Sequence, residues 1–427
     1  MMNHPKMRYT YVGVDSHKDT HTAVFLDCFF DKIGEITFNN LPSKFDAFLS
    51  DAEKLKLDGT ELMFGLEDIG SYGRTLTAYL TGKKQHVKHV NSYLVAGERE
   101  KQHITQKTDG IDAECAARLL LSNFNELPTA DPDDRYWILR TMVVRRNQTV
   151  RNNTRTKMIL HNLLVHHCPN YRSFFKNTFL KTSLAFFKAY PSPSTLEGVT
   201  VEELADFLYD ESNGVLGLEN AKEKAKHILD SCEDTTTMYQ EIRNDAVRSA
   251  IRQMEFSIEE LEQMEKSMAI YLERLDSPLL SMAGIDVVTA CQLMSCIGDI
   301  KRFPTAAKLA RYSGIAPVTY ASGMKAYQFA NQRGRRELNS LFFGLAVRVT
   351  SPIGSNHKIL NQFFYDYYHR KMAEGKTKRQ SLKCVQRRLV NIIWTMLTNG
   401  EEYVNPPLMD MPLEMAIENK VVKPKTS

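Results

Sequence analysis

The pattern of hydrophobic and polar positions over the first 130 residues predicts a five-stranded sheet with flanking helices. Short runs of β-branched and aromatic residues are separated by turn residues, which is typical of strands, and stretches with helical spacing come after the third run. We expect strands over 10–15, 21–27, 34–39, 61–67 and 86–90, and helices over 43–55, 72–80 and 109–121. Three strands in succession, then alternating helices and strands, indicate a mixed α/β sheet.

Two long helical patterns follow the polar stretch 129–135, which we interpret as a domain boundary. They cover 136–166 and 244–275, and an inserted helical lobe of about 169–235 separates them. In the second pattern apolar residues recur every seven positions. These positions are Val247, Met254, Leu261, Met268 and Leu275, with Ile251, Ile258 and Met264 on the same flank. An antiparallel helical hairpin or an intermolecular coiled coil would explain both patterns.

The rest of the chain reads as mostly helical from 279 to 394, with a break of strand or loop at 315–329. Residues 281–295 have the pattern of a helix–hairpin–helix element that turns at Gly284, although Asp286 would oppose a DNA phosphate there. The predicted organisation is therefore multidomain. It has an α/β domain over 1–130, a helical coiled-coil region over 131–276, a mostly α domain over 277–400 and a tail over 401–427.

Composition and charge then narrow the function. Hydrophobic residues make up 43% of 427, which excludes a chain that is disordered throughout. The longest apolar runs are too short to span a membrane, and no secretory signal is evident. The seven cysteines include no Cys-x-x-Cys pair, so we expect reduced thiols and a cytoplasmic location.

Basic residues are segregated, although the net charge is only +4. Residues 135–196 contain 11 Lys or Arg and no acid, and residues 325–388 contain 14 basic and three acidic residues. Such segregation favours a nucleic acid as partner over ordinary solvated helix faces. The candidate nucleic-acid-binding residues are Arg145, Arg146, Arg151 and Arg155 in the first segment and Lys325, Arg333, Arg335 and Arg336 in the second.

Four carboxylates occupy positions that suit a metal site. Asp15 and Glu67 end predicted strands, and Asp109 and Asp112 lie three residues apart on one helix. Strand ends carry the chemistry of open α/β sheets. Mg²⁺ prefers oxygen ligands, and two such ions can act on a phosphodiester. Singly, each acid is more often a helix cap or a solvated charge, so only the set indicates a ribonuclease H-like metal site.

These residues carry a resemblance to a known family. Residues 13–27, 65–80 and 90–120 resemble the DEDD-type, RuvC-like domain of the one-ten family of insertion-sequence transposases. The strongest matches are D-x-x-K-x-x-H, formed by Asp15, Lys18 and His21, and K-T-D-x-x-D-A at 107–113. The resemblance implies that Asp15, Glu67, Asp109 and Asp112 are catalytic ligands of Mg²⁺ or Mn²⁺. Lys18 and His21 read either as a surface pair on a turn or as phosphate contacts.

Residues 279–346 resemble the second domain of the same family, in which the serine of P-x-x-x-x-S-G is the nucleophile. Pro317 and Ser322 keep that spacing here. The family implies a prokaryotic DNA recombinase, acting at the nucleoid, guided by an element-encoded bridge RNA that pairs with DNA. It also implies a homo-oligomer, dimer or tetramer, in which Ser322 forms a phosphoserine link to DNA in a composite site between subunits, near the metal.

Two alternative functions remain open from the sequence. One is a RuvC-type junction nuclease that uses metal and water without a covalent intermediate, and the other is a non-catalytic RNA-binding protein. Two weaker signals have structural interpretations. A zinc site at His161, His166, His167 and Cys168 is disfavoured. The phenylalanines between 174 and 187, interleaved with lysines, are better explained by an aromatic core than by base stacking.

Overall fold

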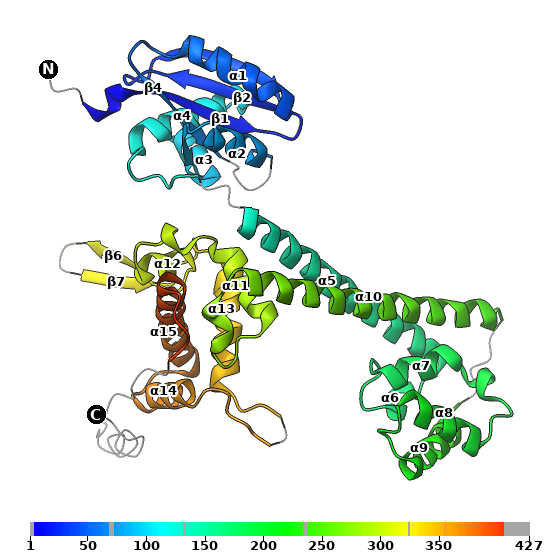
Figure 1. Ribbon diagram of the computed structural model, residues 1–427. Helices are drawn as coiled ribbons and strands as arrows, with labels where there is room; N and C mark the ends of the chain where they lie inside the picture. The colour runs from blue at the N-terminus through cyan, green and yellow to red at the C-terminus, as the bar shows by residue number, and fades with distance from the viewer. Residues whose placement is uncertain are drawn as a thin grey trace. The chain divides into compact units, whose positions relative to one another are not determined.

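The structure is a computed structural model that describes residues 4–67, 72–130, 134–233, 238–322, 325–354 and 356–404. It divides into two compact units, Met1–Ile138 and Leu139–Ser427 (Figure 1). No helix in the described part of the chain is both long and apolar enough to cross a membrane. The expected tail beyond residue 404 lies outside the described residues.

The first unit is the expected mixed α/β sheet with helices. Its elements are β1 (Tyr9–Ser16), β2 (Thr20–Leu26), β3 (Lys32–Asn39), α1 (Pro42–Leu55), β4 (Glu61–Leu66), α2 (Arg74–Gly82), β5 (His86–His89), α3 (Ser92–Lys101) and α4 (Asp109–Asn123). A 3₁₀ helix, Pro5–Arg8, precedes β1. Apart from the 3₁₀ helix and α3, each of these elements was predicted from the sequence, with bounds that differ by a few residues. Helix α3 was missed because it buries a single residue, Val95, and its sequence therefore carries no apolar periodicity that would mark a helix.

Strand order places the ends of β1 and β4 side by side. The sheet runs β3-β2-β1-β4-β5, with β1, β4 and β5 parallel and β2 antiparallel to both of its neighbours. Val14 pairs with Leu66 in the parallel β1–β4 register. Asp15 and Glu67 are the next residues along each strand, so they lie at the same edge of the sheet.

The two faces of β1 pack against different helices. Val12 and Val14 lie in a core with α1 and α2, which contribute Phe45, Phe48, Leu76 and Leu80. Tyr11 packs on the other face with Val95 of α3 and Cys115 of α4. Gly13 shares that face, and a Cβ there would lie 2.0 Å from the carbonyl oxygen of Ala113. The absence of a side chain at Gly13 therefore lets α4 cross β1 at close range.

The second unit is mostly helical, as expected. Its elements are α5 (Asp134–His167), which begins in the first unit, α6 (Tyr171–Phe174), α7 (Lys181–Ala189), α8 (Val201–Glu211), α9 (Leu218–Ser231), α10 (Gln240–Arg274), α11 (Val287–Ile297), α12 (Ala306–Tyr312), β6 (Val318–Ser322), β7 (Lys325–Phe329), α13 (Arg336–Thr350), α14 (Gln362–Ala373) and α15 (Lys378–Asn399). Short 3₁₀ helices cover Pro193–Leu196, Pro278–Ser281 and Ile300–Arg302.

Helices α5 and α10 form an antiparallel pair. Near one end, Arg146 of α5 bonds to Glu265 of α10 at 2.7 Å. Near the other end, Leu164 shares a core with Val247 and Met254. The heptad residues Val247, Met254 and Met268 are buried, but Leu261 and Leu275 remain partly exposed. The apolar seam is therefore interrupted rather than continuous.

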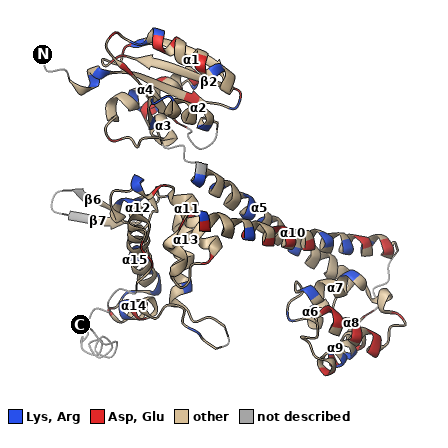
Figure 2. Ribbon diagram, in the orientation of Figure 1, with Lys and Arg blue, Asp and Glu red and all other residues tan. Residues whose placement is uncertain are grey.

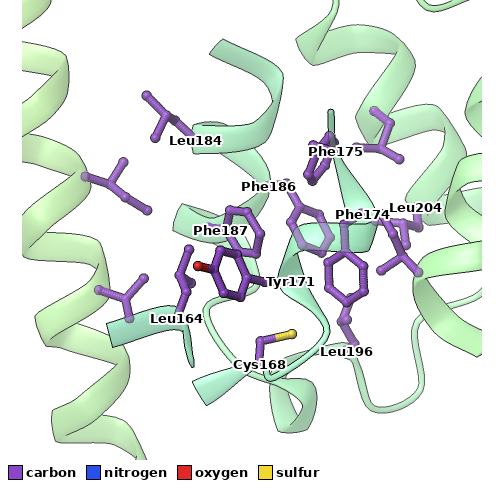
Figure 3. Close-up of a cluster of buried hydrophobic side chains, with 14 of the residues drawn as sticks. Leu164, Cys168, Tyr171, Phe174, Phe175, Leu184, Phe186, Phe187, Leu196 and Leu204 are labelled. Carbon is purple, nitrogen blue, oxygen red and sulfur yellow. The ribbon is translucent and has the colours of Figure 1, made fainter. Parts of the chain in front are cut away.

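The inserted lobe, α6 to α9, packs around aromatic side chains (Figure 3). Phe174, Phe186 and Phe187 are fully buried, and Phe179 packs partly buried against the same cluster. Residues from the end of α5 and the start of α10 belong to this core. The interpretation of these phenylalanines as an aromatic core is confirmed.

The expected helix–hairpin–helix element differs in its first arm. Before Gly284 the chain forms only the short 3₁₀ helix Pro278–Ser281, and α11 follows. Asp286 caps α11 by accepting a hydrogen bond from the Thr289 backbone N–H at 2.7 Å, and it pairs with Arg348 at 2.9 Å. Since a carboxylate already occupies this helix start, the structure argues against a DNA phosphate there.

Candidate functional site

Four carboxylates from three elements gather at one edge of the sheet in the first unit. Asp15 lies at the end of β1, Glu67 directly after β4, and Asp109 and Asp112 in the first turn of α4. The close crossing of α4 over Gly13 brings the helix start above the end of β1. Asp15 and Asp112 are buried, at 8% and 7% exposure. The folding of this unit therefore assembles residues that lie almost a hundred positions apart.

Three basic side chains face these carboxylates. His17 Nε2 lies 3.1 Å from Asp15 Oδ2 and 3.1 Å from Asp109 Oδ1. Arg99 of α3 forms a hydrogen-bonded ion pair with Asp112, and Lys107 Nζ lies 4.0 Å from the same carboxylate. None of these partners was singled out from the sequence except Lys107, as part of a motif. Helix α3, which supplies Arg99, was itself missed.

Burial raises the pKa of Asp15 above its ordinary value; His17 opposes this shift, and the charges of Asp109 and Asp112 add to it. Burial also raises the pKa of Glu67; a hydrogen bond with Ser92 opposes it, and Asp15 and Asp112 again add to it. Carboxyl groups that raise one another's pKa form a region of concentrated negative charge. Such a region is stabilised by a bound cation.

The donor set fits a divalent metal ion. Asp15, His17 and Asp109 each offer one ligand atom, and these atoms lie within 4.8 Å of one another. Glu67 and Asp112 interact electrostatically with Asp15 and with each other. A hollow of about 610 Å³ opens beside Asp109, lined also by Thr22, Glu35 and Glu114. A ligand could therefore reach Asp109 from solvent.

The two basic residues of the D-x-x-K-x-x-H motif have different positions. Lys18 is exposed in the turn between β1 and β2. His21 is fully buried in β2, where its ring packs edge-on against Phe38. The interpretation of His21 as part of a surface pair or as a phosphate contact is therefore wrong. The alternation of β2 directs its side chain into the core beneath α1.

Ser322 is the last residue of β6, in a two-stranded ribbon with β7. Its backbone pairs with that of Lys325, and the expected Gly323 lies outside the described residues. Tyr320 and Tyr327, paired in the same register, are 60% and 56% exposed. The Tyr320 and Phe329 rings lie 5.5 Å apart. The predicted nucleophile thus belongs to a ribbon with exposed aromatic side chains.

The candidate nucleic-acid-binding arginines divide into two groups. Arg145, Arg151, Arg155, Arg333 and Arg336 are exposed. In contrast, Arg146 is bonded to Glu265, and Arg335 donates to the Cys296 carbonyl at 3.0 Å, to the Tyr312 hydroxyl and to Glu337. The structure therefore argues against Arg146 and Arg335 as phosphate contacts, since both guanidinium groups already have protein partners.

Helix α5, which contains no acidic residue after Asp134, lies beside an acidic neighbour. Figure 2 shows acidic residues, in red, along α10, which pairs with α5. Glu265 neutralises Arg146, and Glu255 of α10 bonds to Lys188 of α7 at 2.6 Å. Part of the charge that the sequence segregates is thus balanced inside the fold. Arg145, Arg151 and Arg155 stay on the exposed surface of α5.

Two histidines near the end of α5 have hydrogen-bond partners in the lobe and in α5 itself. His161 Nδ1 lies 2.8 Å from the Tyr171 hydroxyl, and His167 Nδ1 lies 2.6 Å from the Leu163 carbonyl oxygen. Among the described residues, metal-binding geometry is found at Asp15, His17 and Asp109 and not at this cluster. His161 and His167 thus each direct one ring nitrogen to an oxygen of the protein.

Comparison with known proteins identifies several relatives. Over 405 residues the chain is 23% identical to a protein of insertion element IS116 from Streptomyces clavuligerus, covering 93% of this chain and 96% of the relative. It is 36% identical over 129 residues to a protein of insertion element IS110 from Streptomyces coelicolor, 30% of each chain. It is also 30% identical over 129 residues to the pilin gene-inverting protein of Moraxella bovis, 30% of this chain and 38% of that protein.

Two family models also match. The first is described as a transposase of the DEDD type and matches residues 12–169, which include all four carboxylates. The second, described as a transposase of the IS116/IS110/IS902 family, matches residues 276–358, which include Ser322. Together they cover more than half of the chain, in the same order as the two regions described above. The chain belongs to the IS116/IS110/IS902 family of transposases.

Proposed function

We propose that this transposase cleaves and exchanges DNA strands with Ser322 as nucleophile and with a divalent ion, Mg²⁺ or Mn²⁺, at a ribonuclease H-like, RuvC-like centre. The ligands are drawn from Asp15, Glu67, Asp109 and Asp112. One observation carries the proposal: four carboxylates from three elements converge at one sheet edge in a member of a transposase family. Holding like charges close together costs free energy, and such arrangements are concentrated at functional sites.

The residues of the centre have separable roles. Asp15 and Asp109 hold the ion, while Arg99 and Lys107 orient Asp112 and offset its charge. When bound, a divalent ion would activate the attacking oxygen and neutralise the leaving oxygen of a phosphodiester. Exposed Lys18, in the turn that follows Asp15, is placed to contact a nearby phosphate.

A serine nucleophile explains strand exchange better than hydrolysis. Exchange must conserve the energy of the phosphodiester while a broken end awaits its new partner, and a serine ester does so. Ser322 lies in an exposed ribbon, and Arg333 and Arg336 follow it closely in sequence as possible partners of the scissile phosphate. Lys325 pairs with Ser322 through the backbone.

The exposed arginines of α5 and the basic C-terminal segment support nucleic-acid partners. We propose that the protein binds DNA and an element-encoded bridge RNA, and that base pairing by this RNA selects the sites. We also propose a dimer or tetramer held by the α5–α10 pair. The corresponding domains are 1–130, 131–276 with its lobe, and 277–400.

The test uses recombination of a plasmid carrying the element ends, with trapping of covalent intermediates. Ser322→Ala should lower strand exchange by a factor on the order of 10³ or more, while RNA and DNA binding persist. Thr319→Ala, which removes an exposed hydroxyl from the same strand, is the matched control and should stay active. Mass spectrometry should place the trapped DNA on the peptide that contains Ser322.

The metal is tested in the same assay. Asp15→Asn and EDTA should each abolish exchange, whereas Asp19→Asn, a change in the neighbouring turn, should not. If Ser322→Ala recombines at the wild-type rate, the nucleophile is wrong, and a nuclease that uses metal and water replaces this proposal. Full activity in EDTA would show that the reaction needs no metal. Strand exchange after complete ribonuclease treatment would show that it needs no guide RNA.

A further inference from the structure

His17 bridges two of the four carboxylates, Asp15 and Asp109. Its Nε2 atom is 3.1 Å from one oxygen of Asp15 and 3.1 Å from one oxygen of Asp109. Neighbouring ligands of an octahedral ion with bonds of about 2.1 Å are separated by roughly 3 Å. The imidazole nitrogen therefore already lies at the spacing of a neighbouring ligand from each carboxylate oxygen, and the three atoms lie within 4.8 Å of one another.

We propose that His17 Nε2 is a ligand of the catalytic divalent ion and that this nitrogen shifts the centre's preference from Mg²⁺ toward Mn²⁺. The inference rests on the proposed function, because it assumes that the carboxylate centre binds metal. Mg²⁺ selects oxygen ligands and gives up its water reluctantly. First-row transition ions accept imidazole nitrogen more readily. A centre with two carboxylates and one imidazole is therefore better suited to Mn²⁺ than a centre of carboxylates alone.

The backbone holds His17 in place. Its N–H donates to the Thr20 carbonyl at 3.0 Å, which closes the turn between β1 and β2. The Asn40 side-chain amide donates to the carbonyls of His17 and Lys18, at 3.4 and 3.2 Å. Pre-organised ligands lose little conformational entropy when an ion binds. The backbone that carries the imidazole is thus fixed by the fold before any ion arrives.

Packing does not account for the placement of the ring. The side chain of His17 is 51% exposed, whereas that of Asp15 beneath it is 11% exposed. The more exposed imidazole thus lies 3.1 Å from an oxygen of the more buried carboxylate. A histidine that served only as a counter-ion would be displaced by metal, and its removal would strengthen metal binding or leave it unchanged. A ligand predicts the opposite.

The experiment measures metal binding by the full-length protein. Mn²⁺ affinity is followed by the electron paramagnetic resonance of free Mn²⁺, Mg²⁺ affinity by competition, and nitrogen coordination by the electron spin-echo modulation of ¹⁴N. Wild-type protein should show a directly coordinated ¹⁴N. His17→Ala should lose it and bind Mn²⁺ about tenfold more weakly, with a smaller loss for Mg²⁺.

His86→Ala is the matched control. His86 is another half-exposed histidine in the same unit, paired with Glu61 at 2.8 Å, at the opposite end of β4 from Glu67. It should bind both ions as wild type does. If His17→Ala binds Mn²⁺ as tightly as wild type or more tightly, or if wild type shows no ¹⁴N coupling, His17 is not a ligand. That result would leave the carboxylate centre itself in place. If Asp15→Asn also binds Mn²⁺ as wild type does, the carboxylate centre itself fails, and the metal part of the proposed function fails with it.

Discussion

The carboxylate centre and the β6–β7 ribbon carry the two groups of proposed reactive residues, but they are built in opposite ways. The carboxylates of the centre come from three elements, and two of them are buried. The ribbon is a two-stranded sheet, and its aromatic side chains are more than half exposed. One site depends on long-range packing, and the other depends on a local hairpin.

This difference reflects what each group must do. Like charges can be held together only by a scaffold that resists their repulsion, so the centre needs the sheet, α3 and α4 around it. A nucleophile that attacks DNA must instead project to where a large substrate can reach it. Substitutions should therefore change folding and activity together in the centre, but change activity alone in the ribbon.

The largest effect should come from the crossing of α4 over β1. Gly13→Ala places a Cβ 2.0 Å from the Ala113 carbonyl oxygen, so α4 must move. We expect a loss of about 1–3 kcal/mol or more in the free energy of unfolding, together with loss of metal binding. Thermal unfolding followed by circular dichroism measures the first, and Mn²⁺ titration measures the second.

The control for that change is Gly97→Ala in α3, where an added Cβ meets nothing within 4 Å. It should be neutral or slightly stabilising, since alanine favours a helix. Equal stability of the Gly13 and Gly97 variants would mean that the centre does not depend on this crossing, and the contrast with the ribbon would disappear.

Substitutions of two neighbouring arginines after the ribbon should differ in effect: one should lower protein stability, and the other should weaken nucleic-acid binding. Arg335 is fixed by Cys296, Tyr312 and Glu337, so Arg335→Ala should cost about 1–3 kcal/mol of stability. Arg336 is exposed, so Arg336→Ala should leave stability unchanged and reduce the salt dependence of nucleic-acid affinity by about one ion. Denaturation curves and binding across a salt series measure these effects, and a reversed pattern would exchange the two roles.

The smallest effect is a pH dependence of opposite sign in the two units. The folded-state pKa of Asp15 is raised, so its folded form is penalised as pH rises above about 4. Asp15→Asn should therefore unfold at a higher temperature than wild type at pH 7 in EDTA, and the gain should shrink as pH falls toward 4.

Asp286 is the matched comparison. Burial opposes its ionisation, but the Thr289 N–H and hydroxyl and the Arg348 guanidinium outweigh burial and lower its pKa. Its contribution is present above about pH 4 and is lost as pH falls through the folded pKa. Asp286→Asn should therefore unfold at a lower temperature at pH 7. Shifts of the same sign in both variants would contradict the electrostatic difference between the two sites.

Strong periodicity made most of the fold predictable. The alternating runs that became β1 to β5 and the long helices α5 and α10 carry clear patterns, whereas α3 does not. The four carboxylates could be found because the ends of strands and the i, i+3 spacing on a helix can be recognised from the sequence alone. His17 was missed, although its position two residues after Asp15 was a usable signal.

Pairings across the fold could not be read in the same way. Arg146 and Arg335 look like free cations in the sequence, but their partners lie 119 residues away, at Glu265, and 39 residues away, at Cys296. His21 resembles a surface residue because β2 begins only one residue earlier, at Thr20. In each case the deciding fact is a contact between distant segments, which local patterns do not contain.

The core of the lobe has a mechanical consequence for the α5–α10 pair. That core joins the end of α5 to the start of α10 through Leu164, Val247 and Met254, and nearer the middle of α5 Arg146 bonds to Glu265. Along the middle of α5, the buried positions are the polar Thr149, Asn153 and Thr156, which add little apolar adhesion. At 34 residues and about 1.5 Å per residue, α5 is roughly 50 Å long. Because the apolar contacts concentrate at the lobe and the buried positions in the middle of α5 are polar, we expect the two helices to separate first along this polar stretch under load.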